Sequence, residues 1–338
     1  MAMTHLIPPD RLDAVRTALF SVFQTTAPDT IELLSGGLSG SGVYRIAVRE
    51  QDCLLKLDPP GVGSGNDRAT VLRQVSAAGI APELFYRNDE AGISLSRFIA
   101  GQPLRASLTP EEVVRALGER IRLWHDLPCD VPGEHLSVTV DSLISGFRAN
   151  RFLTGDAIDE GLARYDRIRQ AAPWQDADLV LSHNDLNPAN ILCEGKRLRI
   201  IDWDGAGRNN RYVDLAAAAN FFTHSAEEEQ LLLGVYFGRE PSEEEQARLF
   251  LMRQVSRLIY GLLLTDVAAR AASPGQILNQ EMDGFSLGRF GELAQAGKLS
   301  LRTSGGQLFY AKANLNEAFR QMASDRLEDA LRIIGHAQ

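Results

Sequence analysis

The 338-residue sequence has little cysteine and few aromatic residues, and it lacks any long apolar run. Its cysteines, Cys53, Cys129 and Cys193, are scattered without paired-ligand spacing, so they indicate neither a disulfide framework nor a zinc site. We expect all three to be core thiols. No apolar stretch approaches the roughly 20 residues that cross a bilayer, and residues 1–10 lack the pattern of a secretory signal. These features predict a cytoplasmic protein with no membrane partner.

Clustered positive charge is also missing, since 35 Lys and Arg residues face 44 Asp and Glu residues and the net charge is −9. Affinity for a phosphate backbone depends on grouped Lys and Arg side chains, so we expect no nucleic-acid partner. An acidic surface suits a cationic small molecule better. The oligomeric state cannot be read from these numbers.

Short β-rich runs separated by Gly-rich turns fill most of the first hundred residues, after an amphipathic helix expected over residues 11–23. A further helix is expected over residues 67–78, where Gly79 is a plausible terminator. The pattern predicts an antiparallel sheet beside two helices. The expected strands cover residues 31–34, 43–48, 53–57, 83–86 and 93–99.

From Pro110 onward the apolar residues recur at helical spacing, with Thr109 as the N-cap and Pro110 at the first helical position. The rest of the chain is expected to be mostly helical, with short strands only around a central motif over residues 183–202. The further expected helices cover residues 141–152, 158–170, 214–222, 226–236, 242–270 and 314–334. The expected strands there cover residues 179–182, 191–193 and 198–201.

One run near the middle of the chain carries most of the chemistry. His183-Asn184-Asp185 follows a strand, Asn190 lies five residues beyond Asp185, and Asp202 ends the next apolar strand. This is the spacing at which a kinase places an acid that accepts the acceptor's proton and two oxygen ligands for Mg²⁺. Any one of these residues could instead belong to a polar turn. Their joint occurrence between strands favours phosphotransfer, with His183 bracing the loop.

The N-terminal third supplies partners for such a site. Residues 35–42 form a Gly/Ser-rich link between two strands, which could bring backbone N–H groups close to phosphate oxygens or could be a plain hairpin turn. Lys56 lies in the following strand, where a lysine would reach the α- and β-phosphates rather than be merely solvated. The expected phosphate-binding residues are Gly37, Ser39, Gly40, Ser41, Gly42 and Lys56.

Together these motifs, with Gly79-Ile80-Ala81-Pro82, Leu123-Trp124-His125-Asp126-Leu127 and Ile201-Asp202-Trp203-Asp204, resemble the aminoglycoside phosphotransferase and choline kinase superfamily. The resemblance implies an α+β, bilobal protein-kinase-like fold, with a small antiparallel-sheet lobe over residues 1–98 and a larger helical lobe over residues 99–338. It implies ATP and Mg²⁺ as cofactors and a small-molecule alcohol as substrate. The implied site comprises Asp185 as catalytic acid, Asn190 and Asp202 on metal, Lys56 on phosphates, and Arg97, Phe98 and Ile99 as the adenine hinge.

One residue, Arg68, departs from the pattern of such kinases, and another, Asp214, is expected to be structural. Such kinases pair the strand lysine with a helix glutamate, yet a simple alignment puts Arg68 at that position. Asp67 could take the role, the nucleotide alone could hold Lys56, or the enzyme could be slow or inactive. Asp214, in a segment similar to one in aminoglycoside kinases, is expected to be a helix N-cap with a structural role.

The acceptor is left open between two chemistries. A quaternary ammonium would need aromatic faces, for which Trp203 is the best placed by sequence, whereas a polyamine alcohol would need carboxylates, for which Asp204 is the best placed. The more distant candidates are Phe221, Phe222, Tyr260, Phe285 and Phe290 among aromatics, and Asp266, Glu281 and Asp283 among acids.

The sequence thus predicts a small-molecule kinase acting on an amino alcohol or an aminoglycoside-like compound. The alternative is a nucleotide-binding pseudokinase with a regulatory or interaction role, motivated by Arg68. A protein kinase is disfavoured, because no Ala-Pro-Glu-like segment follows Asp202 to build an activation loop.

Overall fold

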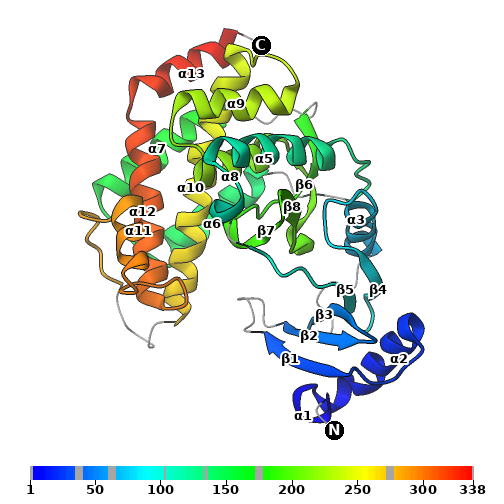
Figure 1. Cartoon of the computed structure of the whole chain (residues 1–338). Helices are drawn as coiled ribbons and strands as arrows, with labels where there is room; N and C mark the ends of the chain where they lie inside the picture. The colour runs from blue at the N-terminus through cyan, green and yellow to red at the C-terminus, as the bar shows by residue number, and fades with distance from the viewer. Residues whose placement is uncertain are drawn as a thin grey trace. The chain divides into compact units, whose positions relative to one another are not determined.

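A five-stranded antiparallel sheet occupies the N-terminal part of the computed structural model, in the order β1-β2-β3-β5-β4 (Figure 1). All five strands lie where the sequence pattern places them, within a few residues at each end. Their bounds are β1 Thr30–Leu34, β2 Gly42–Val48, β3 Gln51–Leu57, β4 Leu84–Asn88 and β5 Ile93–Arg97.

The structure describes residues 3–34, 41–59, 66–102, 104–131, 133, 136–171, 178–271 and 278–336. The chain divides into two units, each built from two separate segments. Unit 1 comprises Met1–Pro132 and His183–Gly207, and unit 2 comprises Gly133–Ser182 and Arg208–Gln338. Unit 1 therefore holds both the sheet and the central motif. The lobe boundary after residue 98 stays a prediction.

One face of the sheet packs against α2 (Leu12–Phe23), which is preceded by α1 (Met3–Leu6) and a 3₁₀ turn η1 (Pro9–Arg11). Side chains alternate between the two faces of a strand, so Cys53, Leu55 and Leu57 of β3 are buried against this helix. Leu54 and Lys56 consequently lie on the opposite face. That alternation makes one strand serve both the core and a polar pocket.

Two helices of unit 1 begin or end as the sequence predicts. α3 (Asn66–Ala77) terminates at Gly79, whose φ of +66° closes a Schellman-type turn in which the Ile80 N–H donates to the Val75 carbonyl. α5 (Pro110–His125) starts with a capping box between Thr109 and Glu112. The short helix α4 (Leu104–Ser107) precedes it and was not predicted.

The central motif folds as a hairpin with two 3₁₀ turns, also within unit 1. β7 (Ile191–Glu194) pairs antiparallel with β8 (Arg197–Ile200), and η3 (Pro188–Asn190) and η4 (Trp203–Gly205) flank them. The register sets Ile191 opposite Ile200. The residues just outside that pair, Asn190 and Ile201, are therefore neighbours.

Unit 2 is mostly helical, with β6 (Leu179–Ser182) paired to β9 (Gly207–Asn210). The long helix α10 (Glu243–Ala271) packs along α12 (Ser304–Met322), where a Cβ at Gly261 would lie only 2.6 Å from Leu315. No described helix is long and apolar enough to cross a membrane. The helices are α6 Leu136–Ala149, α7 Asp156–Gln170, α8 Tyr212–Phe222, α9 Ala226–Phe237, α10 Glu243–Ala271, α11 Leu287–Gln295, α12 Ser304–Met322 and α13 Asp325–His336.

Two sequence predictions for this unit are wrong, and one of its helices, α11, was not predicted. The single helix expected over residues 314–334 is two helices, and α12 starts at Ser304 because the Thr303 hydroxyl accepts a hydrogen bond from the Gly306 N–H and caps it. α11 was missed because it is short and none of its residues is buried. Asp214 is not the N-cap of α8, since the helix begins one turn earlier from Arg211 and Asp214 lies buried in its first turn.

Candidate active site

The hairpin brings the two halves of the central motif together. The Ile201 N–H donates to the Asn190 carbonyl at 2.9 Å, and the His183 ring contacts the Ile201 carbonyl through Nε2 at 2.9 Å. His183 is fully buried and thus braces the loop, as the sequence predicts. Both the N–H and the carbonyl of Ile201, the residue before Asp202, are therefore hydrogen-bonded to residues that flank Asp185.

Asp185 is the centre of a small set of amide contacts. The Asn190 side-chain amide donates to the Asp185 backbone carbonyl at 2.9 Å and to its carboxylate at 3.1 Å. The Asn187 amide donates to the other carboxylate oxygen at 3.0 Å. Since the amide nitrogen of Asn190 faces these acceptors, its oxygen is the atom with which it would coordinate a cation. The turn therefore orients both predicted functional groups.

Asp202 follows β8 in a left-handed backbone conformation, with φ of 62°. Such a conformation is uncommon for a residue other than glycine and is found mostly where surrounding contacts impose it. The contacts here come from Trp203, whose indole N–H donates to the Ile200 carbonyl and whose ring packs edge-on against Trp124 and His183. Trp203 is buried. A ring buried in this way supports the loop, and Trp203 also contributes to the lining of the pocket described below. An acceptor contact by Trp203 stays a prediction.

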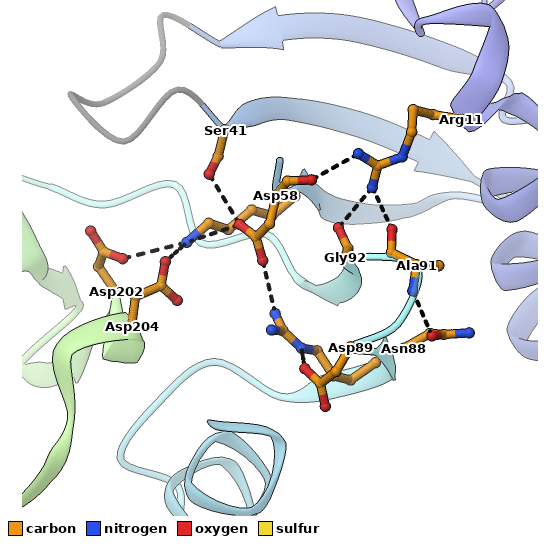
Figure 2. A network of polar contacts seen from close by, with 11 residues as sticks. Arg11, Ser41, Asp58, Asn88, Asp89, Ala91, Gly92, Asp202 and Asp204 are labelled. Carbon is orange, nitrogen blue, oxygen red and sulfur yellow. Dashed lines mark hydrogen bonds and ion pairs between the residues drawn. The ribbon is translucent and has the colours of Figure 1, made fainter. Parts of the chain in front are cut away.

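Lys56 reaches this loop from β3. Its Nζ lies 2.6 Å from Asp204 Oδ2 and 3.5 Å from Asp202 Oδ1. A third carboxylate, Asp58 Oδ1, is 3.7 Å away (Figure 2). Burial by itself would lower the pKa of Lys56, but Asp204, Asp202 and Asp58 together raise it. The ammonium group is therefore charged at neutral pH.

A pocket opens on this face of β3. Ser94 and Ser96 of β5 stand opposite Lys56 and Leu54, and their small side chains leave room above the sheet. Apolar walls that meet a lysine and two aspartates suit a ligand with a flat apolar part and an anionic part. The lining residues are Leu54, Lys56, Leu72, Ala81, Pro82, Leu84, Arg87, Ser94, Ser96, Ile201, Asp202, Trp203 and Asp204.

The predicted hinge follows the pocket directly along the chain, since the described lining on β5 ends at Ser96. Arg97 forms two hydrogen bonds with the carboxylate of Glu194, at 2.6 and 3.1 Å. The Phe98 N–H donates to the Asp52 carbonyl, and Ile99 is buried. An adenine contact by these three residues stays a prediction.

The glycine-rich link is only partly described. Gly37, Ser39 and Gly40 lie outside the described residues. Ser41 is buried and its hydroxyl donates to Asp58 Oδ1 at 3.0 Å, while Gly42 begins β2. Phosphate binding by this segment stays a prediction.

The donor set around the loop fits a hard divalent cation. Asp202 offers a carboxylate that is 45% exposed, and Asn190 offers a side-chain amide oxygen. The Asn190 backbone is hydrogen-bonded to Ile201, the residue before Asp202. Within the described ranges no group of three or more His, Cys, Asp or Glu side chains is arranged to hold a metal. Mg²⁺ is usually held by one or two protein oxygens together with substrate phosphates.

Two residues of the site were not predicted from sequence. Asp58 lies two residues beyond Lys56, which puts both on one face at the end of β3, and Arg87 approaches it from β4 at 3.3 Å. The i, i+2 spacing of a lysine and an aspartate in a strand was the available signal. It is a weak signal, because the same spacing occurs on solvated edges.

Solved structures share this fold. A choline/ethanolamine kinase family protein from Mesorhizobium loti matches with a TM-score of 0.69 at 20% identity, covering 96% of this chain and 99% of that one. A choline kinase from Cryptosporidium parvum matches with a TM-score of 0.60 at 14% identity, covering 90% and 92%. A spectinomycin phosphotransferase solved with ADP and spectinomycin matches with a TM-score of 0.59 at 14% identity, covering 89% and 98%. No curated protein sequence matches this chain.

The sheet, the helices and the hairpin thus define an α+β, kinase-like fold of the type found in small-molecule phosphotransferases. Residues 30–250 match the model of the phosphotransferase enzyme family, which is more than half of the chain. This chain belongs to that family.

Proposed function

We propose that this chain is an ATP- and Mg²⁺-dependent kinase that transfers the γ-phosphate to a hydroxyl group of a small molecule. The observation that carries the proposal is the convergence at Asp202. His183 and Asn190, which flank Asp185, are hydrogen-bonded to Ile201, the residue before Asp202. Lys56 reaches Asp202 from the sheet. Family membership supports the reaction class.

Each residue has a distinct role in this proposal. Asp185, oriented by its amide contacts, aligns the acceptor hydroxyl and accepts its proton. Asn190 and Asp202 would hold Mg²⁺, which when bound neutralises charge on the phosphate oxygens. Lys56 contributes a fixed positive charge toward the α- and β-phosphates. The main contributions are therefore positioning and electrostatic stabilisation.

We propose an amino alcohol or an aminoglycoside-like compound as acceptor. The net charge of −9 favours a cationic molecule, and relatives of the same fold are described as choline/ethanolamine kinase family proteins and as a spectinomycin phosphotransferase. Asp204, 35% exposed, could receive such a cation if it exchanges Lys56 for the acceptor's amine. A second amine group of the acceptor would be bound by other carboxylates.

The test is a transfer assay with γ-labelled ATP and Mg²⁺ over amino alcohols, aminoglycosides, sugars, nucleosides and peptides. We expect one acceptor of the first two classes to be phosphorylated, and Asp185→Ala to reduce kcat roughly 10³-fold. Asp159→Ala, which removes an exposed carboxylate on α7, is the matched control and should keep wild-type turnover. Normal turnover by Asp185→Ala would show that another group is the base.

A pseudokinase is the second candidate, and Arg68 at the expected glutamate position is the observation that favours it. It predicts that ATP with Mg²⁺ raises the melting temperature while no acceptor in the panel is phosphorylated. Transfer to any acceptor at an enzymatic rate would exclude it.

A further inference from the structure

Of the three carboxylates around Lys56, one differs from the others in its surroundings. The side chains of Asp202 and Asp204 are 45% and 35% exposed, whereas that of Asp58 is only 3% exposed. Exposed carboxylates beside a phosphate site can exchange a lysine for a metal ion or a substrate group. A buried carboxylate keeps its protein partners, because losing them would leave an uncompensated charge.

The Asp58 carboxylate is held by groups from two other segments. Ser41 Oγ donates to Oδ1 at 3.0 Å, and Arg87 approaches Oδ2 at 3.3 Å from β4. Arg87 is itself oriented by Asp89, at 2.6 Å from its Nε. The carboxylate therefore has a fixed direction before any ligand binds (Figure 2).

The backbone of Asp58 is equally constrained. Its carbonyl accepts a hydrogen bond from the buried Arg11 guanidinium at 2.7 Å, and its N–H donates to the Gly92 carbonyl at 2.8 Å. Arg11 also donates to the Gly92 carbonyl, so the end of β3 and the β4–β5 turn share one donor (Figure 2). Both the main chain and the side chain of Asp58 are thus anchored.

We propose that Asp58 is the positioning residue for Lys56, holding its ammonium group on the pocket side of β3 both in the free protein and when Asp202 and Asp204 take other partners. The inference rests on the proposed nucleotide-binding role of Lys56. It also gives Lys56 an acidic partner that does not depend on the residue at position 68, because Asp58 directly follows the lysine's own strand. Ser41 ties the end of the glycine-rich link to the same carboxylate, so the link and Lys56 share one anchor.

The direct test measures Lys56 itself, with no nucleotide present. Full-length wild type, Asp58→Asn and Asp89→Asn are treated with an amine-reactive acylating reagent, and modification of Lys56 is followed by peptide mass spectrometry. Without the buried carboxylate the ammonium group is held less firmly and is more open to the reagent, so Asp58→Asn should be acylated at least about threefold faster than wild type. Asp89→Asn removes another carboxylate on Arg87 but none beside Lys56, and should match wild type. Equal rates for Asp58→Asn and wild type would overturn the inference.

The second test measures nucleotide affinity by titration calorimetry with ADP and Mg²⁺. Asp58→Asn should bind roughly tenfold more weakly than wild type, and Asp89→Asn should bind as wild type does. In a Lys56→Met background, adding Asp58→Asn should change affinity less than about twofold, because the group it positions is gone. Undiminished ADP affinity of Asp58→Asn, or an equal tenfold loss in the Lys56→Met background, would contradict the positioning role.

Two controls keep the outcomes separable. If wild type binds no nucleotide, the proposed function fails while the acylation rates still decide the role of Asp58. If Asp58→Asn unfolds because Arg87 loses its buried partner, the double variant Asp58→Asn/Arg87→Met removes both charges and is measured in its place. Its Lys56 should show the same faster acylation, and a wild-type rate would reject the inference.

Discussion

The two faces of β3 carry opposite kinds of chemistry within a few residues. Leu55 and its alternate neighbours are buried against α2, whereas Lys56 faces a pocket with three carboxylates within 4 Å. The first face contributes burial of apolar area, and the second concentrates charge. Neighbouring positions on one strand should therefore separate folding from function when they are substituted.

Lys56→Met should give the largest effect on the pocket side. Removing one fixed charge at a phosphate site commonly costs 10²- to 10³-fold, so we expect kcat/KM for ATP to fall by about 10³-fold. The melting temperature should stay within a few degrees of wild type, because Asp58 retains Arg87 and Ser41. Steady-state kinetics and calorimetric unfolding measure the two quantities. A collapse of stability with little kinetic effect would erase the contrast between the faces.

Leu55→Ala should show the opposite pattern on the core side. Truncating a fully buried leucine costs roughly 2–5 kcal/mol, which for a chain of this size corresponds to a fall of roughly 3–7 °C in melting temperature. Turnover per folded molecule should be retained. Leu54→Ala is the matched variant, since Leu54 lines the pocket, and it should lose less stability but bind ADP more weakly. Equal destabilisation by both variants would argue against the alternation of faces.

Gly92→Ala tests the turn between β4 and β5, whose Gly92 carbonyl accepts a hydrogen bond from the Asp58 N–H at the end of β3. Its φ is +57° and an added Cβ would lie 3.0 Å from the Asp58 carbonyl oxygen. We expect a loss of about 1–2 kcal/mol in the free energy of unfolding, measured by urea titration. Gly195→Ala has a similar φ but nothing within 4 Å of the added Cβ, so it should lose less.

Glu194→Gln should give the smallest effect, and one that depends on pH. Hydrogen bonds from Arg97, and then from Arg199, hold the pKa of Glu194 at about 2, below its ordinary value of 4.5. The ion pair therefore stabilises the fold fully above about pH 4.5, and its contribution declines as the pH falls toward 2. Wild type should melt about 2 °C above Glu194→Gln at pH 7, with the difference shrinking between pH 5 and pH 3. The control Glu111→Gln removes an exposed carboxylate of α5 and should change little at either pH.

The sequence predicted the sheet and the central motif well because their signals are local. Apolar alternation gave β1 to β5, and the Thr109 cap gave the start of α5. The family match confirms the resemblance that those motifs carried. What escaped prediction depended on contacts between distant segments. Asp58 acquires its surroundings only when Arg87 and Ser41 meet it.

The same reasoning missed the burial of Trp203. Its position after Asp202 placed it near the site, and in the structure its ring packs edge-on against Trp124 and His183 just after the left-handed Asp202. A backbone reversal at one residue redirects every following side chain. Periodicity within a strand carries no information about such a reversal.

Arg11 lies outside residues 30–250, the segment that matches the family model, yet its guanidinium donates to carbonyls of Asp58, Ala91 and Gly92. A graft of the matched segment onto a foreign N-terminus would leave those three oxygens to find new donors. A transplant of this domain should therefore include residues 9–23, because Arg11 lies outside the matched segment and yet holds the carbonyl of Asp58 at the end of the strand that carries Lys56.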